Sequence, residues 1–118
     1  MVKFRFQDLE VWQIAIEIAD DLFDIADNLE NRKLYRFAEQ LRGAGMSISN
    51  NISEGSGSDS AKDFAHFLNI AKRSTFENAN IIILLKRRDL ISSEKENELL
   101  EKLDKLSRKI ANLRKTLK

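Results

Sequence analysis

The sequence predicts an all-α protein, an up-down-up-down antiparallel four-helix bundle that forms a single domain over residues 1–118. Three observations predict this fold. The chain has no proline and only four glycines, so little interrupts its helices. Apolar residues recur at three- and four-residue spacing in four separate segments, which is the period of a helix that buries one face. Short polar turns join these segments, and short turns make consecutive helices antiparallel neighbours.

The first predicted helix covers residues 8–29 and has a wider apolar surface than one bundle core requires. Asp8 stands at the N-cap position, where a side-chain oxygen accepts a hydrogen bond from a free backbone N–H. One core needs an apolar stripe of roughly 100°, whereas this helix carries two adjacent stripes. We therefore expect it to contact more than its own bundle, and the chain to be an oligomer. The stripes are Leu9, Trp12, Ile16, Ala19, Phe23 and Ala26, and Val11, Ile14, Ile18, Leu22, Ile25 and Leu29.

The second predicted helix covers residues 33–53 and is followed by a stretch rich in glycine and serine. Gly55 and Gly57 can adopt the left-handed conformation that terminates helices, so we expect them to end it. Its inward-facing residues are Leu34, Phe37, Leu41, Ala44, Ile48 and Ile52.

Serine residues mark the starts of the last two helices. Ser60, with Asp63 three residues later, has the spacing of a capping box. Ser92 or Ser93 is expected to cap the fourth helix, with Glu96 at a box position. The fourth helix then has the most regular pattern of the chain, a heptad seam of leucine and isoleucine. That seam is Leu99, Leu103, Leu106, Ile110, Leu113 and Leu117.

A line of polar residues runs along the second helix beside its apolar seam. A buried polar group without a partner costs about 1–3 kcal/mol, so the simplest arrangement is a layer in which polar groups of the second and third helices hydrogen-bond to one another and fix the register. The alternatives are a ligand or partner site, with Glu54 and Glu77 lining a pocket, and a metal site. The set on the third helix is Ser74, Glu77, Asn78 and Asn80. The predicted polar layer is Gln40, Ser47, Asn51, Glu54, Ser74 and Glu77.

Three blocks of the sequence resemble the family of 23S rRNA intervening sequence proteins. The block QLRGAGMSISNNISEG is similar to the family's Q-L-R-R-A-x-x-S-I-P-x-N-I-A-E-G. FQDLEVWQIA is similar to its F-x-D-L-x-V-W-x-x-A, and DFAHFLNIAKRSTFE to its E-F-x-R-F-L-x-I-A-x-G-S-x-x-E. The resemblance extends in order over roughly residues 4–90. The chain departs from the family at Gly43, where arginine is usual, at Ser49, where proline is usual, and at Ser58 and Asp59, where basic residues are usual.

The resemblance implies an up-down four-helix bundle that assembles into a ring of identical chains, with a homopentamer as the expected state. The family is encoded within insertions in bacterial 23S rRNA genes, among other places. It is related to accessory proteins of diversity-generating retroelements, which bind nucleic acid and a reverse transcriptase. No catalytic residue and no cofactor carries over from the family. The resemblance therefore implies a binding protein associated with nucleic acid.

Charge is distributed unevenly, although the net charge is only +1. Residues 8–30 hold eight acidic residues and no lysine or arginine, whereas residues 105–118 hold six basic residues and no acid. The two segments either pair, or are solvated faces whose fields partly cancel, or leave a basic surface for an anionic partner. For the third case we predict weak, sequence-independent binding of RNA or DNA. The candidate residues are Lys105, Arg108, Lys109, Arg114, Lys115 and Lys118.

Other function classes are disfavoured by what the sequence lacks. Without cysteine there is no disulfide, thiolate nucleophile or thiolate metal site. The single histidine, His66, forms one pair with Asp63, but a di-iron bundle needs two such pairs and two further glutamates. No phosphate-binding loop occurs, and no apolar run is long enough for a membrane span. We expect a cytoplasmic, non-enzymatic protein without metal or cofactor. A protein-interaction scaffold, using the apolar or acidic surface of the first helix, is the alternative to nucleic-acid binding.

Overall fold

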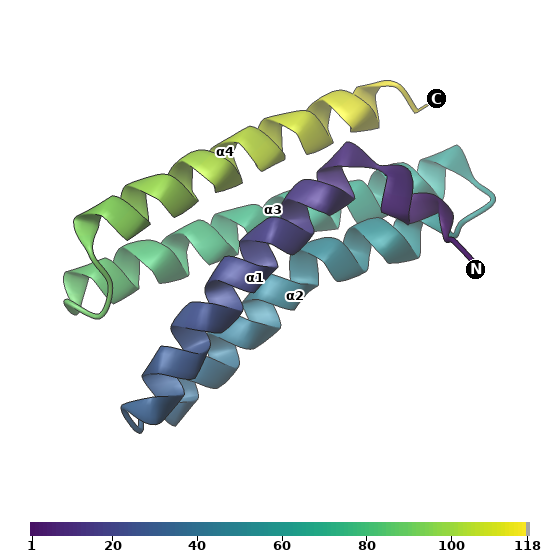
Figure 1. The fold of residues 1–118 in the computed structure, drawn as a ribbon. Helices are drawn as coiled ribbons and strands as arrows, with labels where there is room; N and C mark the ends of the chain where they lie inside the picture. Colours follow the sequence, from purple (N-terminus) through teal and green to yellow (C-terminus); the bar gives the residue numbers. More distant parts are fainter. Residues whose placement is uncertain (118) are drawn as a thin grey trace.

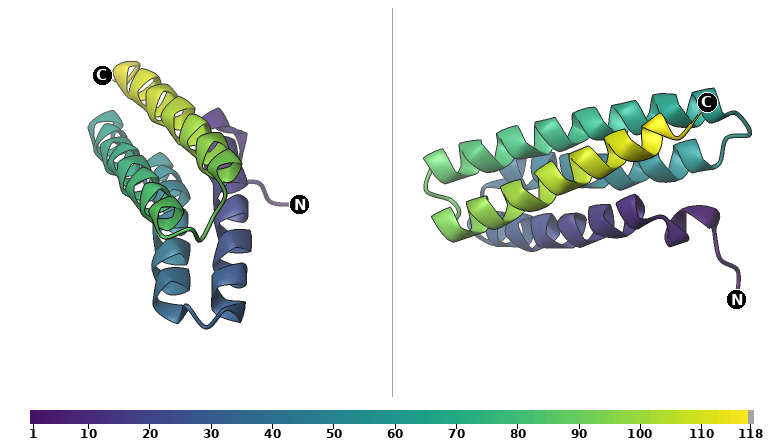
Figure 2. Two further views of the ribbon diagram at one scale, coloured as in Figure 1. Left: turned by 90° about the vertical axis from the view of Figure 1, so that its left-hand side faces the viewer. Right: turned by 90° about the horizontal axis from the view of Figure 1, so that it is seen from above.

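The computed structural model describes residues 1–117, which form four α-helices, one short 3-10 helix and no strand. The prediction of an all-α protein is confirmed. Each α-helix packs against the next one along the chain, and α1 also makes a smaller contact with α4 (Figure 1). The N-terminus, the C-terminal end of α4 and the α2–α3 turn lie at the same end of the molecule (Figure 2). The elements are η1 Arg5–Asp8, α1 Glu10–Asn31, α2 Tyr35–Ser56, α3 Ala61–Arg87 and α4 Ser93–Lys115.

The helices enclose one core of leucine, isoleucine and alanine side chains. The seam predicted for the fourth helix is confirmed, since its first four members are buried and Leu113 and Leu117 are partly buried against the same core. Both stripes of α1 are also used within the chain. Among the twelve residues of these two stripes, only Ile16 and Phe23 are half-buried without packing on the core. The chain therefore covers most of the wide apolar face by itself. The buried α1 residues are Val11, Ala15, Ile18, Ala19, Leu22, Ile25, Ala26 and Leu29.

The first helix begins two residues later than predicted, and Asp8 is not its cap. Asp8 is the last residue of η1, and Leu9 occupies the N-cap position of α1 without a side-chain cap. The 3-10 turn forms because aromatic residues hold it on α1: the ring of Phe6 lies 5.2 Å from that of Trp12 and 5.6 Å from that of Phe4. Packing of aromatic side chains thus overrides the capping preference of Asp8.

Non-glycine residues in the left-handed region follow two of the helices, where glycine was not needed. Lys33 and Asp89 have φ of 64° and 58° after α1 and α3. The prediction that glycines end the second helix in this conformation is wrong, because Gly57 has φ of −80° and Gly55 lies inside α2. Gly55 serves close packing instead: a Cβ there would lie 2.5 Å from the Cβ of Phe67.

The predicted serine caps are confirmed at the starts of α3 and α4. The Ser60 hydroxyl accepts a hydrogen bond from the backbone N–H of Asp63 at 3.2 Å. Of the two serines before α4, Ser92 is the cap, and its hydroxyl accepts from the N–H of Lys95 at 3.1 Å. Each serine thereby satisfies one of the free backbone N–H groups at the start of its helix.

Candidate nucleic-acid interface

Small polar side chains of the predicted layer do meet between α2 and α3. The hydroxyl groups of Ser47 and Ser74 lie 2.7 Å apart in a hydrogen bond that joins the two helices. The Asn51 amide donates to the carbonyl oxygen of Ser47 at 2.7 Å, within its own helix. Ser74 is buried, and the other two are half-buried. This part of the ladder is a structural contact that fixes how α2 lies on α3.

Asn78 is the most deeply buried polar residue of this contact, with no exposed surface. Its amide nitrogen donates to the carbonyl oxygen of Ala44 at 2.8 Å across the helix interface, and to that of Ser74 at 2.7 Å. Its Oδ1 atom is buried without a hydrogen-bond partner among residues 1–117. The small side chain of Ala44 lets α3 come close enough for this bond. Asn78 was among the polar residues predicted on the third helix, but its hydrogen bond to the backbone of α2 was not predicted.

The longer polar residues do not belong to a buried layer, so the prediction is wrong for Gln40, Glu54 and Glu77. All three are exposed. The reason is their position and length: the ladder lies at the edge of the α2–α3 contact, where serine is covered but long side chains extend into solvent. The described residues contain no group of three potential metal ligands. The remaining members of the ladder, Ser47, Asn51 and Ser74, form a hydrogen-bond cluster at the contact of α2 with α3.

The basic residues of α4 divide into paired and unpaired cations. Arg108 binds the Asp104 carboxylate, one bond being 3.1 Å from Nε, and this hydrogen bond raises the pKa of the guanidinium. Lys109 pairs with Glu10 of α1 at 2.9 Å. Lys105 is exposed and makes no ion pair within residues 1–117. Acidic neighbours therefore partly neutralise two of the six predicted residues.

The two remaining described candidates, Arg114 and Lys115, lie at the C-terminal end of α4. Arg114 is exposed, and its Nε donates to the carbonyl oxygen of Ala65 on α3 at 3.1 Å. This bond orients the guanidinium over the α3–α4 boundary. Lys115 is exposed beside it. The sixth candidate, Lys118, lies outside the described residues.

One cation of α3, Lys72, lies beside this end of α4. Lys72 lines an open hollow of about 320 Å³ together with Arg114 and Lys115, and no acidic residue from the described part of the chain lines it. We call this the basic hollow; its other lining residues are Ala65, Ala111 and Leu117. Lys72 was not among the predicted residues, because the sequence alone does not show that this position on α3 lies beside Arg114.

Most ion pairs of the acidic helix α1 involve basic residues outside the predicted C-terminal set. Arg42 of α2 binds Asp27 at 2.6 Å and Glu30 at 2.9 Å. Lys102 of α4 binds Asp21 at 2.9 Å. The negative charge of α1 is therefore neutralised mainly by cations of α2 and of the middle of α4. The C-terminal end of α4 keeps cations that no acid of the described chain pairs with.

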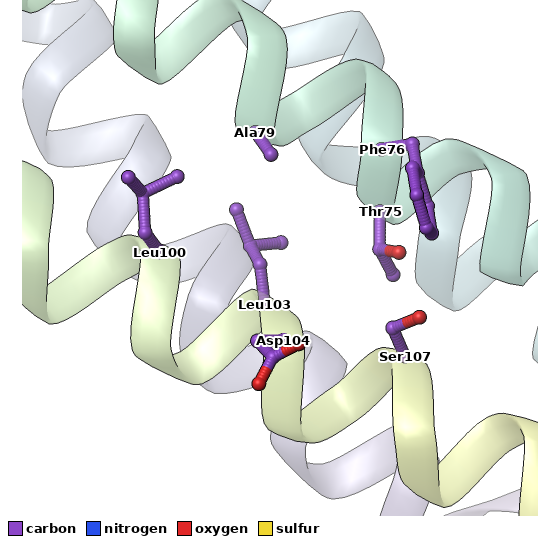
Figure 3. A pocket seen from close by; sticks show the side chains of 7 residues that line it. All are labelled: Thr75, Phe76, Ala79, Leu100, Leu103, Asp104 and Ser107. Atoms are coloured by element: carbon purple, nitrogen blue, oxygen red, sulfur yellow. The ribbon is translucent and has the colours of Figure 1, made fainter.

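A second, apolar cavity of about 130 Å³ lies between α3 and α4 (Figure 3). Leu100 and Leu103 of α4 reach towards α3 on one side, and Thr75 faces Ser107 across the other. The ring of Phe76 stands beside Thr75 at the edge of this cavity (Figure 3). The cavity is too small for a drug-sized ligand, since such sites enclose about 300–1,000 Å³.

Fold and site together define an all-α protein with a basic surface at one end. No helix within residues 1–117 combines the length and the apolar character that crossing a membrane requires. The chain belongs to the 23S rRNA-intervening sequence protein family, whose model matches residues 7–112. The resemblance drawn from the three sequence blocks is thereby confirmed.

A solved structure has the same fold. It is the crystal structure of a protein with unknown function from the S23 ribosomal protein family of Bacteroides thetaiotaomicron VPI-5482. That protein is 25% identical to this chain, with a TM-score of 0.84, and the match covers 89% of this chain and 98% of the other. No curated protein matches the chain.

Proposed function

We propose that the protein is a non-enzymatic, cytoplasmic, nucleic-acid-associated binding protein that contacts phosphates through the basic end of its α3–α4 pair. The observation that carries this proposal is the basic hollow. Lys72, Arg114 and Lys115 come from two helices, line one surface depression and have no acidic residue among them. Such a cluster neutralises phosphates without reading bases, so the binding is weak and independent of sequence.

The proposal includes an up-down-up-down antiparallel bundle that assembles into a ring, with a homopentamer as the expected state. Exposed apolar side chains support self-association: Leu84 of α3 and Met46 of α2 are each 45% exposed. Half-buried Ile16 and Phe23 on α1 add apolar surface. A ring would repeat the basic hollow around its circumference, so weak contacts would add through avidity.

The proposal of a binding protein rather than an enzyme rests on the scarcity of catalytic groups. The sequence holds one histidine and no cysteine. That histidine, His66, is exposed on α3 and lies edge-on to the ring of Phe67. General acid–base catalysis needs a titratable group held within hydrogen-bond reach of a substrate, and His66 has an aromatic neighbour instead.

Titration of a labelled RNA tests the proposal. The purified protein should bind a fluorescently labelled duplex and a single strand in anisotropy measurements at about 50 mM salt. With three phosphate contacts, the affinity should fall roughly 20- to 40-fold at about 200 mM. Absence of binding at the lower salt concentration would contradict the proposal. A protein-interaction scaffold would then be the better account, since the exposed Phe76, Ile83 and Leu84 offer an apolar surface on α3 to a protein partner.

A further inference from the structure

Phe76 is a large aromatic side chain that α3 presents to solvent. It is 65% exposed, the largest value for any apolar residue after the first two of the chain. Burial of a phenylalanine side chain is strongly favourable. A phenylalanine exposed to water in the middle of a helix therefore indicates a binding partner that covers its ring. The α3 spacing places Arg73, Phe76 and Asn80 on one solvent-facing side, because they are three and four residues apart.

Basic and amide groups surround this ring on one side. Phe76 lines an open hollow of about 380 Å³ with Asn69, Lys72 and Arg73, and no acidic residue lines it. Neither Lys72 nor Arg73 forms an ion pair within residues 1–117. Two cations that no carboxylate neutralises thus lie beside an exposed aromatic face.

Lys72 connects this hollow to the basic hollow, since it lines both. The surface therefore continues from the ring of Phe76, past Lys72, to Arg114 and Lys115 at the end of α4. Phe76 also lies at the edge of the apolar cavity (Figure 3). The one acidic residue that lines this cavity, Asp104, is paired with Arg108. An aromatic face thus stands at one end of a line of unpaired cations.

We propose that this surface binds single-stranded nucleic acid, with an unpaired base stacked on Phe76 and the adjoining phosphates lying along Lys72 towards Arg114 and Lys115. The inference rests on the proposed function and names its substrate class. Aromatic platforms beside a cationic groove bind single strands without sequence preference, because every base has a π-face. In a duplex the base faces are already stacked on one another, so Phe76 can stack only on a base of a single strand. The cations contact phosphates of single strands and duplexes alike.

Substitution of Phe76 tests the inference. Anisotropy titrations compare the parent protein with Phe76→Ala, Phe76→Tyr and the matched control Ile83→Ala, which removes another exposed apolar side chain of α3. The probes are labelled RNA and DNA single strands of about 12 nucleotides, within the usual site size, and an RNA duplex of the same length. Phe76→Ala should weaken single-strand binding about 5- to 100-fold, the range of one stacked base. Phe76→Tyr and Ile83→Ala should leave it unchanged, and duplex affinity should not respond to any of the three.

Each other outcome has a distinct meaning. Equal affinity of Phe76→Ala and the parent for single strands would overturn the stacking contact while leaving nucleic-acid binding in place. Absence of binding to every probe at about 50 mM salt would overturn the proposed function and the inference together. A lower mass of Phe76→Ala in light scattering would show that Phe76 lies between copies of the chain, which would also overturn the inference.

Discussion

Replacement of Gly55 by alanine should force the ends of α2 and α3 apart. Gly55 is buried in the last turn of α2. A Cβ at this position would lie 2.5 Å from the Cβ of Phe67 and 3.0 Å from Cδ1 of Phe64. The Cβ of Phe67 is bonded directly to the backbone of α3, so it cannot rotate away as the end of a long side chain would. The helix itself must move.

The size of the effect follows from these distances. Ordinary van der Waals contact of a Cβ begins at 3.4 Å, so a contact of 2.5 Å must lengthen by about 0.9 Å. Overpacking of this kind typically costs about 1–3 kcal/mol. Alanine is favoured over glycine in a helix by up to about 1 kcal/mol, and by less in the last turn, which frays. We expect Gly55→Ala to lower the free energy of unfolding by about 1–2 kcal/mol.

Gly43 provides the matched control within the same helix. It is exposed, and a Cβ built on it meets no atom within 4 Å. Gly43→Ala should therefore raise the free energy of unfolding by about 0.5–1 kcal/mol. Urea titrations followed by circular dichroism at one fixed protein concentration measure both variants, since self-association would shift apparent stability. A Gly55→Ala protein as stable as the parent, or more so, would refute the close packing of α2 on α3.

Three further predictions concern polar groups. Asn78→Ala should lower the free energy of unfolding by about 1–3 kcal/mol in the same urea assay, because it removes two hydrogen bonds and leaves a cavity; no change would contradict a bridging role. Glu54→Ala should change the melting temperature by no more than the equivalent of about 0.5 kcal/mol, because the side chain is exposed; a large loss would place Glu54 in a buried contact. Lys102→Met should lower stability at neutral pH by less than about 1 kcal/mol, since the pair with Asp21 is partly exposed. The hydrogen bond to Asp21 raises the pKa of Lys102. The ion pair therefore stabilises the protein while the lysine is protonated, and this contribution should vanish as the pH rises through the raised pKa. A parent–variant difference that persists in strongly alkaline urea titrations would contradict the ion pair.

Local rules predicted the helices well because each of them acts within a few residues. The heptad seam of α4 and the caps at Ser60 and at Ser92 or Ser93 were predicted from spacing alone. The structure has the seam and the Ser60 cap, and it selects Ser92 for α4. The errors arose where contacts distant in sequence decide the outcome. Phe6 packs on Trp12, and Asp8 is the last residue of a 3-10 helix instead of the cap of α1. Gly55 lies inside α2, where its lack of a side chain lets Phe67 of α3 pack closely against the helix.

The candidate site shows the same division. Arg114 and Lys115 were predicted from the run of basic residues, and both lie at the basic hollow. Lys72 and Phe76 were not, because their nearness to these residues depends on the register of α3 against α4. The polar ladder was right for Ser47 and its partner, but helical periodicity specifies a direction and not a depth. It therefore did not distinguish a serine that α3 covers from a glutamate that reaches solvent.

The most direct test of the central claim is the salt dependence of RNA affinity in a charge-neutralised variant. Arg114→Gln with Lys115→Gln removes two cations at the basic hollow, and Arg32→Gln with Arg36→Gln removes two exposed cations beside the α1–α2 turn as a control. The slope of log affinity against log salt should fall by about 0.7 for each lost phosphate contact on a single strand, hence by about 1.4 for the first variant and by nothing for the control. An unchanged slope in the Arg114→Gln, Lys115→Gln protein, or an equal fall in both variants, would contradict phosphate binding at this end of α3 and α4.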